Sequence, residues 1–526
     1  MVLLWGSNAR AAHPIFFHHL LKGVNNGAQL YVIDPRRTES AQWADLWLGI
    51  DVGSDIALAN AMGKVIIDEG LVDEGFVARA TTGYDDYVAA VQPYTLEHAE
   101  RITGVPGAVI REVAIAYASA KQAQIAWTLG ITEHHNATDN VLALINLSLL
   151  TGHVGRYGSG LVPLRGQNNV QGGGDMGALP NKLPGFQDVE DDQLRARFEA
   201  VWGQSIPPAK GWHLSEMFEA MDAGTLRGVY VIGENPAQSE ADVQHARSLL
   251  EGLDLLVVQD LFLTRTAEMA DVVFPAAADW CEAEGTVTNS ERRVQRVRRA
   301  LPPPGDARTD LDIVVALAGR FGHDWSGLTA QAAWDELRQV SPMHAGMSYA
   351  RLEALGGIQW PCWDEEHPGD RFLHGRLWQD PIGGAPAPFI ATEWVPPVDA
   401  LAPEYPYRLT TGRHLDGYNT GVQSGGFASP LRSWGTLDIS PDDAARLDIA
   451  TGDLVRVASR RGALELPARV ADGLRAGLMF MAVHYPDEVD VNQLTIESWD
   501  PKSGTAEFKA TAVQLEKVSD AATIGT

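Results

Sequence analysis

VLLWGSNARAAHP at residues 2–14, followed by LYVIDPRRTESAQWADLWLGI at residues 30–50, is a layout that the chain contains twice. Its second instance is GVYVIGENPAQSEAD at residues 228–242, followed by LLVVQDLFLTRTAEMADVVFPA at residues 255–276. Each has an apolar, β-branched run, a glycine with an asparagine two residues on, a helical stretch, and a second apolar run that ends in aspartate. We call these pairs of stretches the first copy and the second copy.

The spacing within the two copies agrees closely. Gly6 precedes Asp34 by 28 residues and Gly233 precedes Asp260 by 27, and in both copies another aspartate follows 11 residues later. Small side chains between the aspartates keep one register: Thr38, Ser40, Ala41 and Ala44 in the first copy, and Thr264, Thr266, Ala267 and Ala270 in the second. Agreement at so many positions indicates a duplication.

Each copy has the pattern of a βαβ crossover that binds a nucleotide. A glycine turn after the first strand lets backbone N–H groups and a helix N-terminus face a pyrophosphate, and the aspartate after the next strand lies where ribose or base donors are read. Two ordinary parallel-sheet crossovers are the alternative, and neither copy has the full G-x-G-x-x-G of a standard NAD site. Two matching half-sites suggest two similar ligands, or one ligand with two similar arms.

The segment PLRGQNNVQGGGDMGALP at residues 163–180 has five glycines, four side-chain amides and one arginine, without a period of 2 or 3.6. Glycine destabilises both helices and strands. We therefore expect an irregular loop whose backbone approaches a ligand closely and whose amides pair with it. Arg165 is the single cation of this segment.

The composition excludes several classes of protein. With 41 Lys and Arg against 68 Asp and Glu, the net charge of −27 argues against a nucleic-acid partner. The longest apolar run, at residues 140–152, is too short and too polar to span a bilayer. Cys281 and Cys362 are the only cysteines, and the N-terminus lacks the features of a signal peptide, so we expect reduced thiols and a cytoplasmic location. His134 and His135 are adjacent and cannot easily bind one ion together, so no side chain is predicted as a metal ligand.

Two features mark the C-terminal part as separate. Residues 381–406 contain seven prolines, which is typical of a linker between domains. After them, DLVRVASRRGALELPARV at residues 453–470 alternates with period 2 around a turn, which predicts a β-hairpin in a mainly β domain.

The segment RGQNNVQGGGDMGALPNKLPGF at residues 165–186 closely resembles the formate dehydrogenase catalytic subunits of the molybdopterin oxidoreductase (dimethyl sulfoxide reductase) superfamily. The motif is specific to formate dehydrogenases within that superfamily, and the resemblance spans residues 2–515. DAARLDIATGDLVRVASRRG at residues 443–462 resembles their molybdopterin-dinucleotide-binding domain. Other stretches resemble the same subunits, among them GITEHHNATDNVLALINLSLLTGHVGRYGSG at 130–160 and IQWPC at 358–362.

The resemblance implies an α/β fold with two pseudo-symmetric, Rossmann-like parallel-sheet domains and a C-terminal β-barrel domain. Each α/β domain would hold one pterin guanine dinucleotide, which accounts for the duplication. The expected boundaries are 1–168 for the first dinucleotide-binding domain, 169–380 for the second, 381–405 for a proline-rich linker, 406–518 for the barrel and 519–526 for a tail.

The implied cofactor is a bis-molybdopterin guanine dinucleotide with molybdenum or tungsten. An aspartate suits guanine because its carboxylate accepts from two ring donors at once. One guanosine end would be held by Gly6, Asn8, Asp34, Arg36, Thr38 and Asp55. The other would be held by Gly233, Asn235, Ser239, Gln259, Asp260, Thr264 and Thr266. Gly130, Glu133 and Gln167 would reach the pterins, and the C-terminal domain would close over both ends with Thr411, Arg413, Asn492 and Lys509.

The implied reaction is the oxidation of formate to carbon dioxide, with Arg165 as the catalytic-site arginine that faces formate. A planar, two-pronged cation suits a carboxylate. A structural loop arginine is the alternative. The expected partners are formate, carbon dioxide and electron-transfer subunits or a domain that carry iron–sulfur clusters or are linked to NAD.

Subunits of this family begin with a domain whose four cysteines bind a [4Fe–4S] cluster, and a later cysteine or selenocysteine ligates the metal. Neither Cys281 nor Cys362 matches these roles, and the match begins just after that segment. We therefore expect an N-terminally truncated catalytic subunit that is inactive alone, with a genuine short form as the alternative. A non-catalytic molybdopterin-binding scaffold and another bis-molybdopterin oxidoreductase, such as a nitrate reductase, are the other hypotheses.

Overall fold

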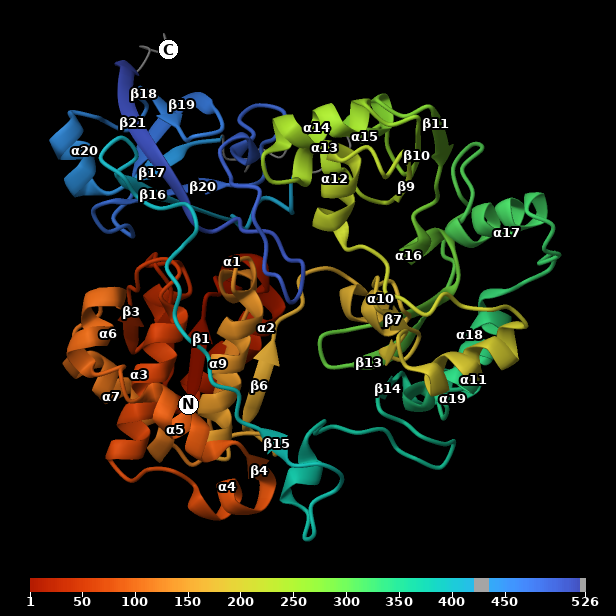
Figure 1. The fold of residues 1–526 in the computed structure, drawn as a ribbon, viewed down its shortest axis with the longest axis horizontal. Helices are drawn as coiled ribbons and strands as arrows, with labels where there is room; N and C mark the ends of the chain where they lie inside the picture. Colours follow the sequence, from red (N-terminus) through yellow and green to blue (C-terminus); the bar gives the residue numbers. More distant parts are fainter. Residues whose placement is uncertain (421–434, 521–526) are drawn as a thin grey trace. The chain divides into compact units, whose positions relative to one another are not determined.

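The structure is a computed structural model of the 526-residue chain, and it describes residues 1–420 and 435–520 (Figure 1). The chain forms two compact units. Unit 1 comprises Met1–Leu164, Gln238–Ala246 and His374–Thr526, and unit 2 comprises Arg165–Ala237 and Arg247–Leu373. Unit 1 is therefore assembled from segments that are far apart in the sequence.

Three strands of the first copy and two later strands build a parallel five-stranded sheet in unit 1, in the order β3-β2-β1-β5-β6. The strands are β1 (Val2–Trp5), β2 (Leu30–Ile33), β3 (Leu46–Leu48), β5 (Gln124–Trp127) and β6 (Gly160–Pro163). The direction of the strand order reverses at β1, because β2 lies on one side of it and the later strand β5 on the other. In open α/β sheets, ligands bind at such a reversal, outside the carboxyl ends of the strands.

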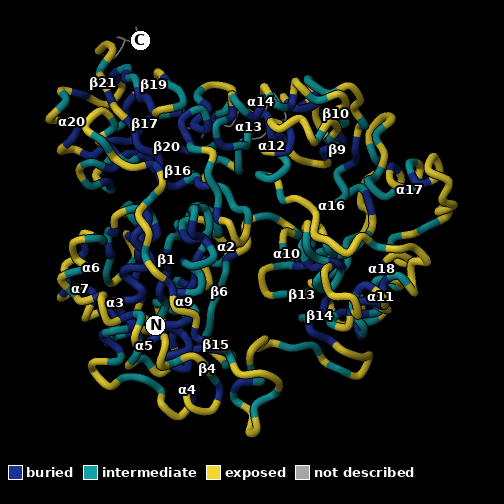
Figure 2. Tube along the Cα trace, viewed as in Figure 1, coloured by how far each residue is buried: buried dark blue, intermediate teal, exposed yellow. Residues whose placement is uncertain are grey.

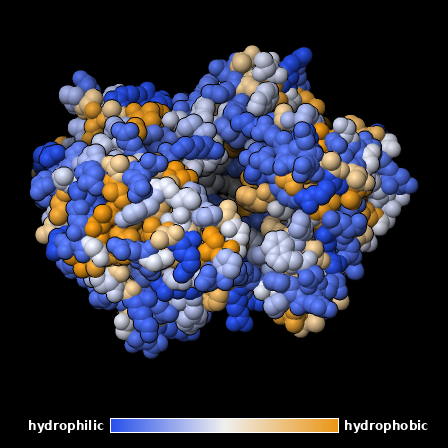
Figure 3. Space-filling view, turned by 60° about the horizontal axis from the view of Figure 1, so that its bottom comes forward, coloured by the Kyte–Doolittle hydropathy of each residue, from blue (hydrophilic) through white to orange (hydrophobic). Residues whose placement is uncertain are grey.

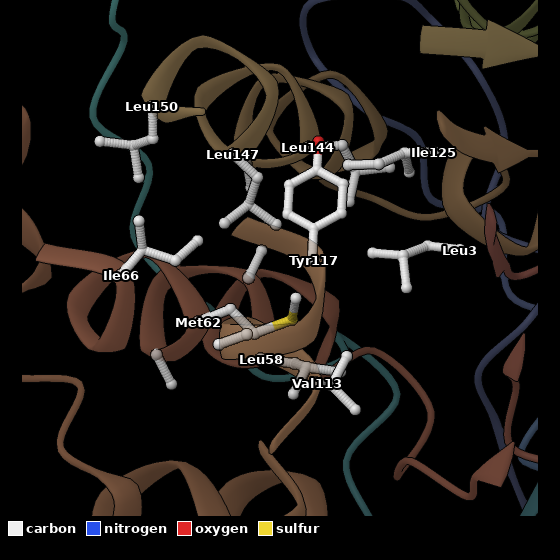
Figure 4. Packing of buried hydrophobic residues seen from close by; sticks show 14 of the residues in the cluster. Leu3, Leu58, Met62, Ile66, Val113, Tyr117, Ile125, Leu144, Leu147 and Leu150 are labelled. Atoms are coloured by element: carbon white, nitrogen blue, oxygen red, sulfur yellow. The ribbon is translucent and has the colours of Figure 1, made fainter. Parts of the chain in front are cut away.

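Alternate residues of β1 belong to two different hydrophobic cores. Leu3 packs with residues of α3 (Asp55–Asp68) and α9 (Ala137–Leu150), and Figure 4 shows the aliphatic side chains of this cluster pointing toward one another. Leu4 packs on the opposite face with residues of α2 (Pro14–Asn25). The strands of this sheet are nearly continuous apolar runs because both of its faces are buried.

The second copy builds a smaller parallel sheet in unit 2, in the order β11-β10-β9. The strands are β9 (Gly228–Ile232), β10 (Leu255–Asp260) and β11 (Val272–Pro275). One face is buried, with Val231 and Val258 packed in a core.

The opposite face of this sheet carries several partly exposed apolar side chains. Alternating positions of the three strands form it, and their exposed fractions are 39% for Tyr230, 48% for Ile232, 48% for Leu255 and 41% for Val272. The burial colouring of Figure 2 shows β1 as mainly dark blue, whereas β9 and β10 carry exposed positions. Among the described residues, this parallel sheet is thus well covered on one side only.

The C-terminal domain is a closed six-stranded barrel, in the order β16-β20-β17-β19-β18-β21. Its strands are β16 (Tyr407–Gly412), β17 (Leu437–Ile439), β18 (Leu454–Ala458), β19 (Ala463–Val470), β20 (Leu478–Ala482) and β21 (Thr511–Ser519). β18 and β19 pair antiparallel from Leu454 opposite Pro467 to Ala458 opposite Ala463, so the predicted hairpin is confirmed. The expected fold class, two parallel-sheet α/β parts and a barrel, is confirmed as well.

The prediction that residues 163–180 are irregular throughout was wrong. A short helix, α10 (Val170–Asp175), lies within the segment and includes three glycines. Asn169 precedes it with φ 62° and accepts a hydrogen bond from the N–H of Thr288 at 2.9 Å. A Cβ on Gly172 would lie 1.9 Å from Oδ1 of Asn169, so the anchored asparagine itself requires glycine there. Tertiary contacts thus override the low helix propensity of glycine.

Part of the proline-rich stretch is bound along unit 1 rather than extending freely. We call residues 387–394 the strap. It begins with β15 (Ala387–Pro388), which pairs in parallel with β4 (Thr81–Thr82). Asn60 of α3 donates from Nδ2 to the carbonyl of Thr392 at 2.9 Å, and Asn146 of α9 donates to the carbonyl of Ile390 at 2.8 Å. These two buried amides take the place of backbone partners for the strap.

Hydrophilic side chains predominate on the face of the molecule drawn in Figure 3, with hydrophobic ones in separate groups. This distribution fits a chain with 68 acidic and 41 basic residues. Within residues 1–420 and 435–520, every helix is too short or too polar to cross a bilayer.

Candidate functional site

The glycine turns of the two copies have the same conformation. Gly6 follows β1 with φ 56°, and Gly233 follows β9 with φ 63°. In each copy the glycine N–H donates to the carbonyl of the last or penultimate residue of the neighbouring strand, Ile33 at 2.8 Å and Gln259 at 2.9 Å. The turn is therefore tied to the strand end that carries the first aspartate.

The asparagine after each glycine holds the segment that follows the second strand. Oδ1 of Asn8 accepts from the N–H of Ser40 at 3.4 Å and from its hydroxyl at 3.0 Å. Oδ1 of Asn235 accepts from the N–H of Thr266 at 3.1 Å and from its hydroxyl at 2.7 Å. The same pair of bonds at the same register positions confirms the duplication predicted from spacing.

Two further contacts repeat in the same register. The hydroxyl of Thr38 accepts from the N–H of Ala41 at 3.3 Å, and that of Thr264 accepts from the N–H of Ala267 at 3.2 Å. The later aspartate of each copy, Asp45 or Asp271, accepts at 2.8 Å from the N–H of the residue 15 positions before it. Both threonines and both asparagines thus shape the turns on which any ligand would rest.

In the first copy the glycine turn touches a second turn, the single-turn helix α8 (Leu129–Thr132) that follows β5. Thr128 and Gly130 both donate to the carbonyl of Gly6, at 3.0 and 3.1 Å. A Cβ on Gly130 would lie 2.5 Å from that oxygen, and a Cβ on Gly6 would lie 2.8 Å from the carbonyl carbon of Gly130. Two backbones meet here without room for a side chain, at the point where the strand order reverses.

Asp34 lies directly after β2 and is 8% exposed. One oxygen accepts from the N–H of Arg36 at 2.9 Å. Burial raises the pKa of Asp34 to about 6, although the Arg36 guanidinium works against the shift. A carboxylate that is costly to ionise at the end of a strand is a candidate ligand-binding group.

Arg36 and Asp55 lie near Asp34 in different environments. The guanidinium of Arg36 lies over the ring of Phe480 from the barrel, 3.6 Å from the centroid. Asp55, 4% exposed, accepts from the indole N–H of Trp5 at 2.7 Å, and burial raises its pKa.

Buried charges connect the turn after β5 with the barrel. Glu507 accepts at 3.1 Å from the N–H of His135 and at 2.9 Å from the N–H of Lys509. Nδ1 of His134 lies 3.3 Å from Oε2 of Glu507, and its Nε2 lies 3.2 Å from the carbonyl of Gly130. Both ring nitrogens face acceptors, which favours the doubly protonated, cationic ring. Although burial opposes the charge, Glu507 raises the pKa of His134.

Next to these buried charges lie Glu133, a predicted pterin contact, and Lys509, one of the C-terminal residues predicted to close over the cofactor. Nζ of Lys509 lies 2.6 Å from Oε2 of Glu133 and donates to the carbonyl of Thr411 at 3.2 Å. The hydroxyl of Thr411 donates to the carbonyl of Phe508 at 2.9 Å. The structure thus brings Glu133, Thr411 and Lys509 together, joined to Gly130 through the buried charges.

The remaining predicted residues of unit 1 lie in other contacts. Nδ2 of Asn492 donates to the carbonyl of Ser239 at 3.0 Å, whereas its buried Oδ1 has no partner among the described residues. Arg413 lies over the ring of Tyr418, 5.9 Å from its centroid. No contact among the described residues joins either group to Asp34.

In unit 2 the second copy places Gln259 and Asp260 at the end of β10. The amide of Gln259 is fully buried and pairs with the hydroxyl of Tyr230 and the carboxylate of Asp310. In this structure its hydrogen bonds are therefore made within the protein. Asp260 is half-buried, accepts from the N–H of Leu261 at 2.6 Å, and has a pKa raised by burial.

Arg165 and Gln167 lie at the start of unit 2, before α10. Nε of Arg165 donates to Oε1 of Gln171 at 3.0 Å, and its carbonyl accepts from the hydroxyl of Ser290 at 3.5 Å. The guanidinium is therefore held along one edge by a neutral side chain.

Several residues of the site were not predicted. Gln171 and Asp175 belong to the amide-rich segment quoted above, so their composition offered a signal. Glu507 is 373 residues from His134, and a lone glutamate before a strand carries no local signal. Trp5 and Phe480 lie in apolar strands, and such runs predict only that these residues are buried in a core.

The family model for molybdopterin oxidoreductase matches residues 1–320, and that for the molybdopterin dinucleotide binding domain matches residues 407–512. The chain belongs to the molybdopterin oxidoreductase family. The resemblance to formate dehydrogenase catalytic subunits is thereby confirmed at the level of the family and of an oxidoreductase.

Relatives with known names match this molybdopterin oxidoreductase over nearly its whole sequence. The F420-dependent formate dehydrogenase subunit alpha of Methanocaldococcus jannaschii is 40% identical over 98% of this chain and 76% of that protein. Formate dehydrogenase H of Escherichia coli is 39% identical over 99% of this chain and 73% of that protein. The solved structure of acetylene hydratase from Pelobacter acetylenicus, with a TM-score of 0.75 and 21% identity, covers 98% of this chain and 78% of that one and shows the same fold.

The residues present fit a molybdopterin cofactor in three respects. Asp34 is a buried acceptor that receives a hydrogen bond from the N–H of Arg36. Oδ1 of Asn492 is a buried acceptor without a partner among the described residues. The backbone at Gly6 and Gly130 leaves no room for a side chain. Pterins and guanine carry several N–H donors, which such acceptors pair with. The oxidoreductase assignment and this set of polar groups therefore agree.

Proposed function

We propose that this molybdopterin oxidoreductase is the catalytic subunit of a formate dehydrogenase. Relatives with that name are about 40% identical over nearly the whole chain. The observation that carries the proposal is the position of Arg165. It is the only cation in a segment of glycines and amides, and its Nε edge is fixed by Gln171.

The cofactor we propose is a bis-molybdopterin guanine dinucleotide with molybdenum or tungsten. When bound, its metal accepts the two electrons that leave formate. Asp34 and Asp260 would accept from the two guanines, and the turns at Gly6 and Gly233 would face the phosphates. Glu133 and Lys509 would meet the pterins where the turn after β5 contacts the barrel.

In this proposal Arg165 binds the substrate. Formate loses a proton and two electrons to become carbon dioxide, and a guanidinium that holds both oxygens turns the C–H bond away from the cation. The chain contains two cysteines, so the four thiolates of an iron–sulfur cluster would come from protein outside these residues. Electron-transfer partners with such clusters are therefore part of the proposal.

The test is Arg165→Ala in the holoenzyme, measured as formate-dependent dye reduction together with metal and pterin content. Loss of the cation that binds the substrate carboxylate should cost roughly 2–5 kcal/mol, or about 30-fold to several thousand-fold in kcat/KM. Cofactor content should stay at the wild-type level. Arg165→Lys should recover only part of the rate, because a point charge cannot hold two oxygens in a plane.

Arg197→Ala is the matched control, since Arg197 also bonds a glutamine in unit 2, at 2.9 Å. It should leave formate kinetics unchanged. Full activity of Arg165→Ala with full cofactor would falsify the substrate role. A parallel fall in cofactor content and thermal stability would show instead that Arg165 braces the loop.

A further inference from the structure

Arg165 is the end of a chain of hydrogen bonds that begins at a tryptophan. The indole N–H of Trp360 donates to Oδ2 of Asp175 at 2.8 Å. Nε2 of Gln171 donates to Oδ1 of the same carboxylate at 2.8 Å, and Oε1 of Gln171 accepts from Nε of Arg165 at 3.0 Å. All four residues belong to unit 2.

This chain of bonds has a fixed direction. Asp175 is fully buried, and an ionised carboxylate can only accept hydrogen bonds. Gln171 must therefore turn its NH₂ group to Asp175 and its carbonyl oxygen to Arg165. The four-residue spacing of Gln171 and Asp175 places both on one side of α10.

A guanidinium offers two edges to a carboxylate, the Nη1–Nη2 edge and the edge that includes Nε. Gln171 engages Nε and so fixes how the guanidinium is turned. We propose that Asp175 and Gln171 are positioning residues for Arg165, which fix the orientation in which its guanidinium meets the substrate carboxylate. This inference rests on the proposed role of Arg165 as the formate anchor.

The kinetic test compares Asp175→Asn and Gln171→Met in the holoenzyme. An asparagine at 175 can donate as well as accept, so the Gln171 amide is free to turn its NH₂ group toward Arg165. Loss of one hydrogen bond to a charged group should raise the KM for formate about 10-fold in either variant, with kcat within about 3-fold of wild type. The double variant should show no further rise, because both changes break one chain of bonds.

Gln187→Met is the matched control. Oε1 of Gln187 accepts from Arg197 at 2.9 Å, and its Nε2 donates to the carbonyls of Pro184 and Val340 at 2.7 and 2.8 Å. It is thus another arginine–glutamine pair whose amide has a fixed direction. The KM for formate should be unchanged in this variant.

A second readout does not depend on formate turnover. Phenylglyoxal modification, followed by peptide mass spectrometry, should be several-fold faster at Arg165 in Asp175→Asn, with the rate at Arg197 unchanged. Wild-type KM values in both variants of an active enzyme would overturn the positioning role. If the wild-type holoenzyme oxidises no formate, the proposed function fails, and the modification rates alone decide whether the chain of bonds holds Arg165.

Discussion

The first and second copies carry the same turn, built with the same hydrogen bonds, in two different surroundings. In the first copy, Gly6 is pressed against Gly130, and Asp34 is 8% exposed. In the second copy, a Cβ on Gly233 would meet no atom of the described residues within 4 Å, and Asp260 is half-buried. The local sequence pattern therefore specifies the turn, whereas the elements packed around it decide how strongly each residue is constrained.

The two copies also differ in how they are fixed to other parts of the chain. The first copy meets the barrel at Arg36, whose guanidinium lies over Phe480. Its glycine turn touches Gly130, whose carbonyl faces His134 of the buried pair with Glu507. The second copy bonds the C-terminal domain through Ser239, and its three-stranded sheet carries partly exposed apolar side chains on one face. We therefore expect equivalent substitutions to have larger effects in the first copy.

The largest effect is expected for Glu507→Gln, because it leaves the cationic His134 without its carboxylate. Breaking one side of a buried ion pair costs about 3–5 kcal/mol of unfolding free energy. Burial opposes ionisation, but His134 and its neighbours hold the pKa of Glu507 well below its ordinary value, and Glu507 raises that of His134.

The pH dependence of this effect follows from both shifts. Stability from Glu507 is present above its reference pKa of 4.5 and is lost as pH falls. Stability from His134 is present below its reference pKa of 6.5 and is lost as pH rises through its raised value. Chemical unfolding should thus show the greatest difference from wild type between these two pH values. Glu516→Gln is the control, because it removes an exposed partner of Arg456 and should lower the free energy of unfolding by less than about 1 kcal/mol. An equal loss in Glu507→Gln and Glu516→Gln would contradict the expected importance of the buried pair.

Gly130→Ala should destabilise the chain by about 3 kcal/mol, since its Cβ would lie 2.5 Å from a backbone oxygen that cannot rotate away. Gly233→Ala should cost about 1 kcal/mol, from its positive φ alone. Thermal melting of the two variants measures the contrast. Equal melting temperatures would show that the two turns are constrained alike.

Asp34→Asn should change stability in the opposite direction at neutral pH. The folded pKa of about 6 lies above the reference value of 3.8, so the folded state holds the proton more tightly. Asp34 therefore does not lower the free energy of unfolding below pH 3.8. As pH rises to 6, its ionisation lowers the free energy of unfolding by up to about 3 kcal/mol. The variant should melt higher than wild type at pH 7.5 and equally at pH 3.5, while it retains less cofactor in the holoenzyme. Asp260→Asn should show a smaller stabilisation, because this carboxylate is half-buried.

The smallest effect is expected for Asn8→Ala and Asn235→Ala. Each removes an acceptor for two bonds, from Ser40 or from Thr266, and should cost roughly 1–2 kcal/mol. This pair of variants is the control for the comparison, since the bonds are equivalent in the two copies. If the two losses in free energy of unfolding, measured by urea titration, differ by more than about 1 kcal/mol, the surroundings of each copy affect this contact as well.

The parts of the fold that could be predicted are those with a local pattern. Apolar runs, the glycine–asparagine spacing and the aspartate register identified both copies, and alternation identified the hairpin at residues 453–470. The segment that forms α10 could not be predicted, because Gly172 is explained only by the side chain of Asn169, which is fixed by distant Thr288.

The candidate site was predictable to the same extent. Asp34 and Arg165 stood out because of their residue types and places in a motif. The connection of Glu507 to His134 spans 373 residues, and the bond from Asn60 to the strap spans 332. Contacts of this kind depend on how the chain folds back on itself, which short-range spacing does not encode.

The discontinuous composition of unit 1 has a consequence for the order of events during synthesis. The N-terminal segment of unit 1, which contains the first copy, ends at Leu164. The segment with the strap and the barrel begins only at His374, 210 residues later (374 − 164). At about 5–20 residues per second, the ribosome takes about 10–40 s to make the intervening chain. During that interval Asn60 and Asn146 have no strap to bind, and the turn at Gly130 has no barrel against it. The nascent chain thus leaves these contact surfaces of Asn60, Asn146 and Gly130 uncovered for tens of seconds before Glu507 emerges.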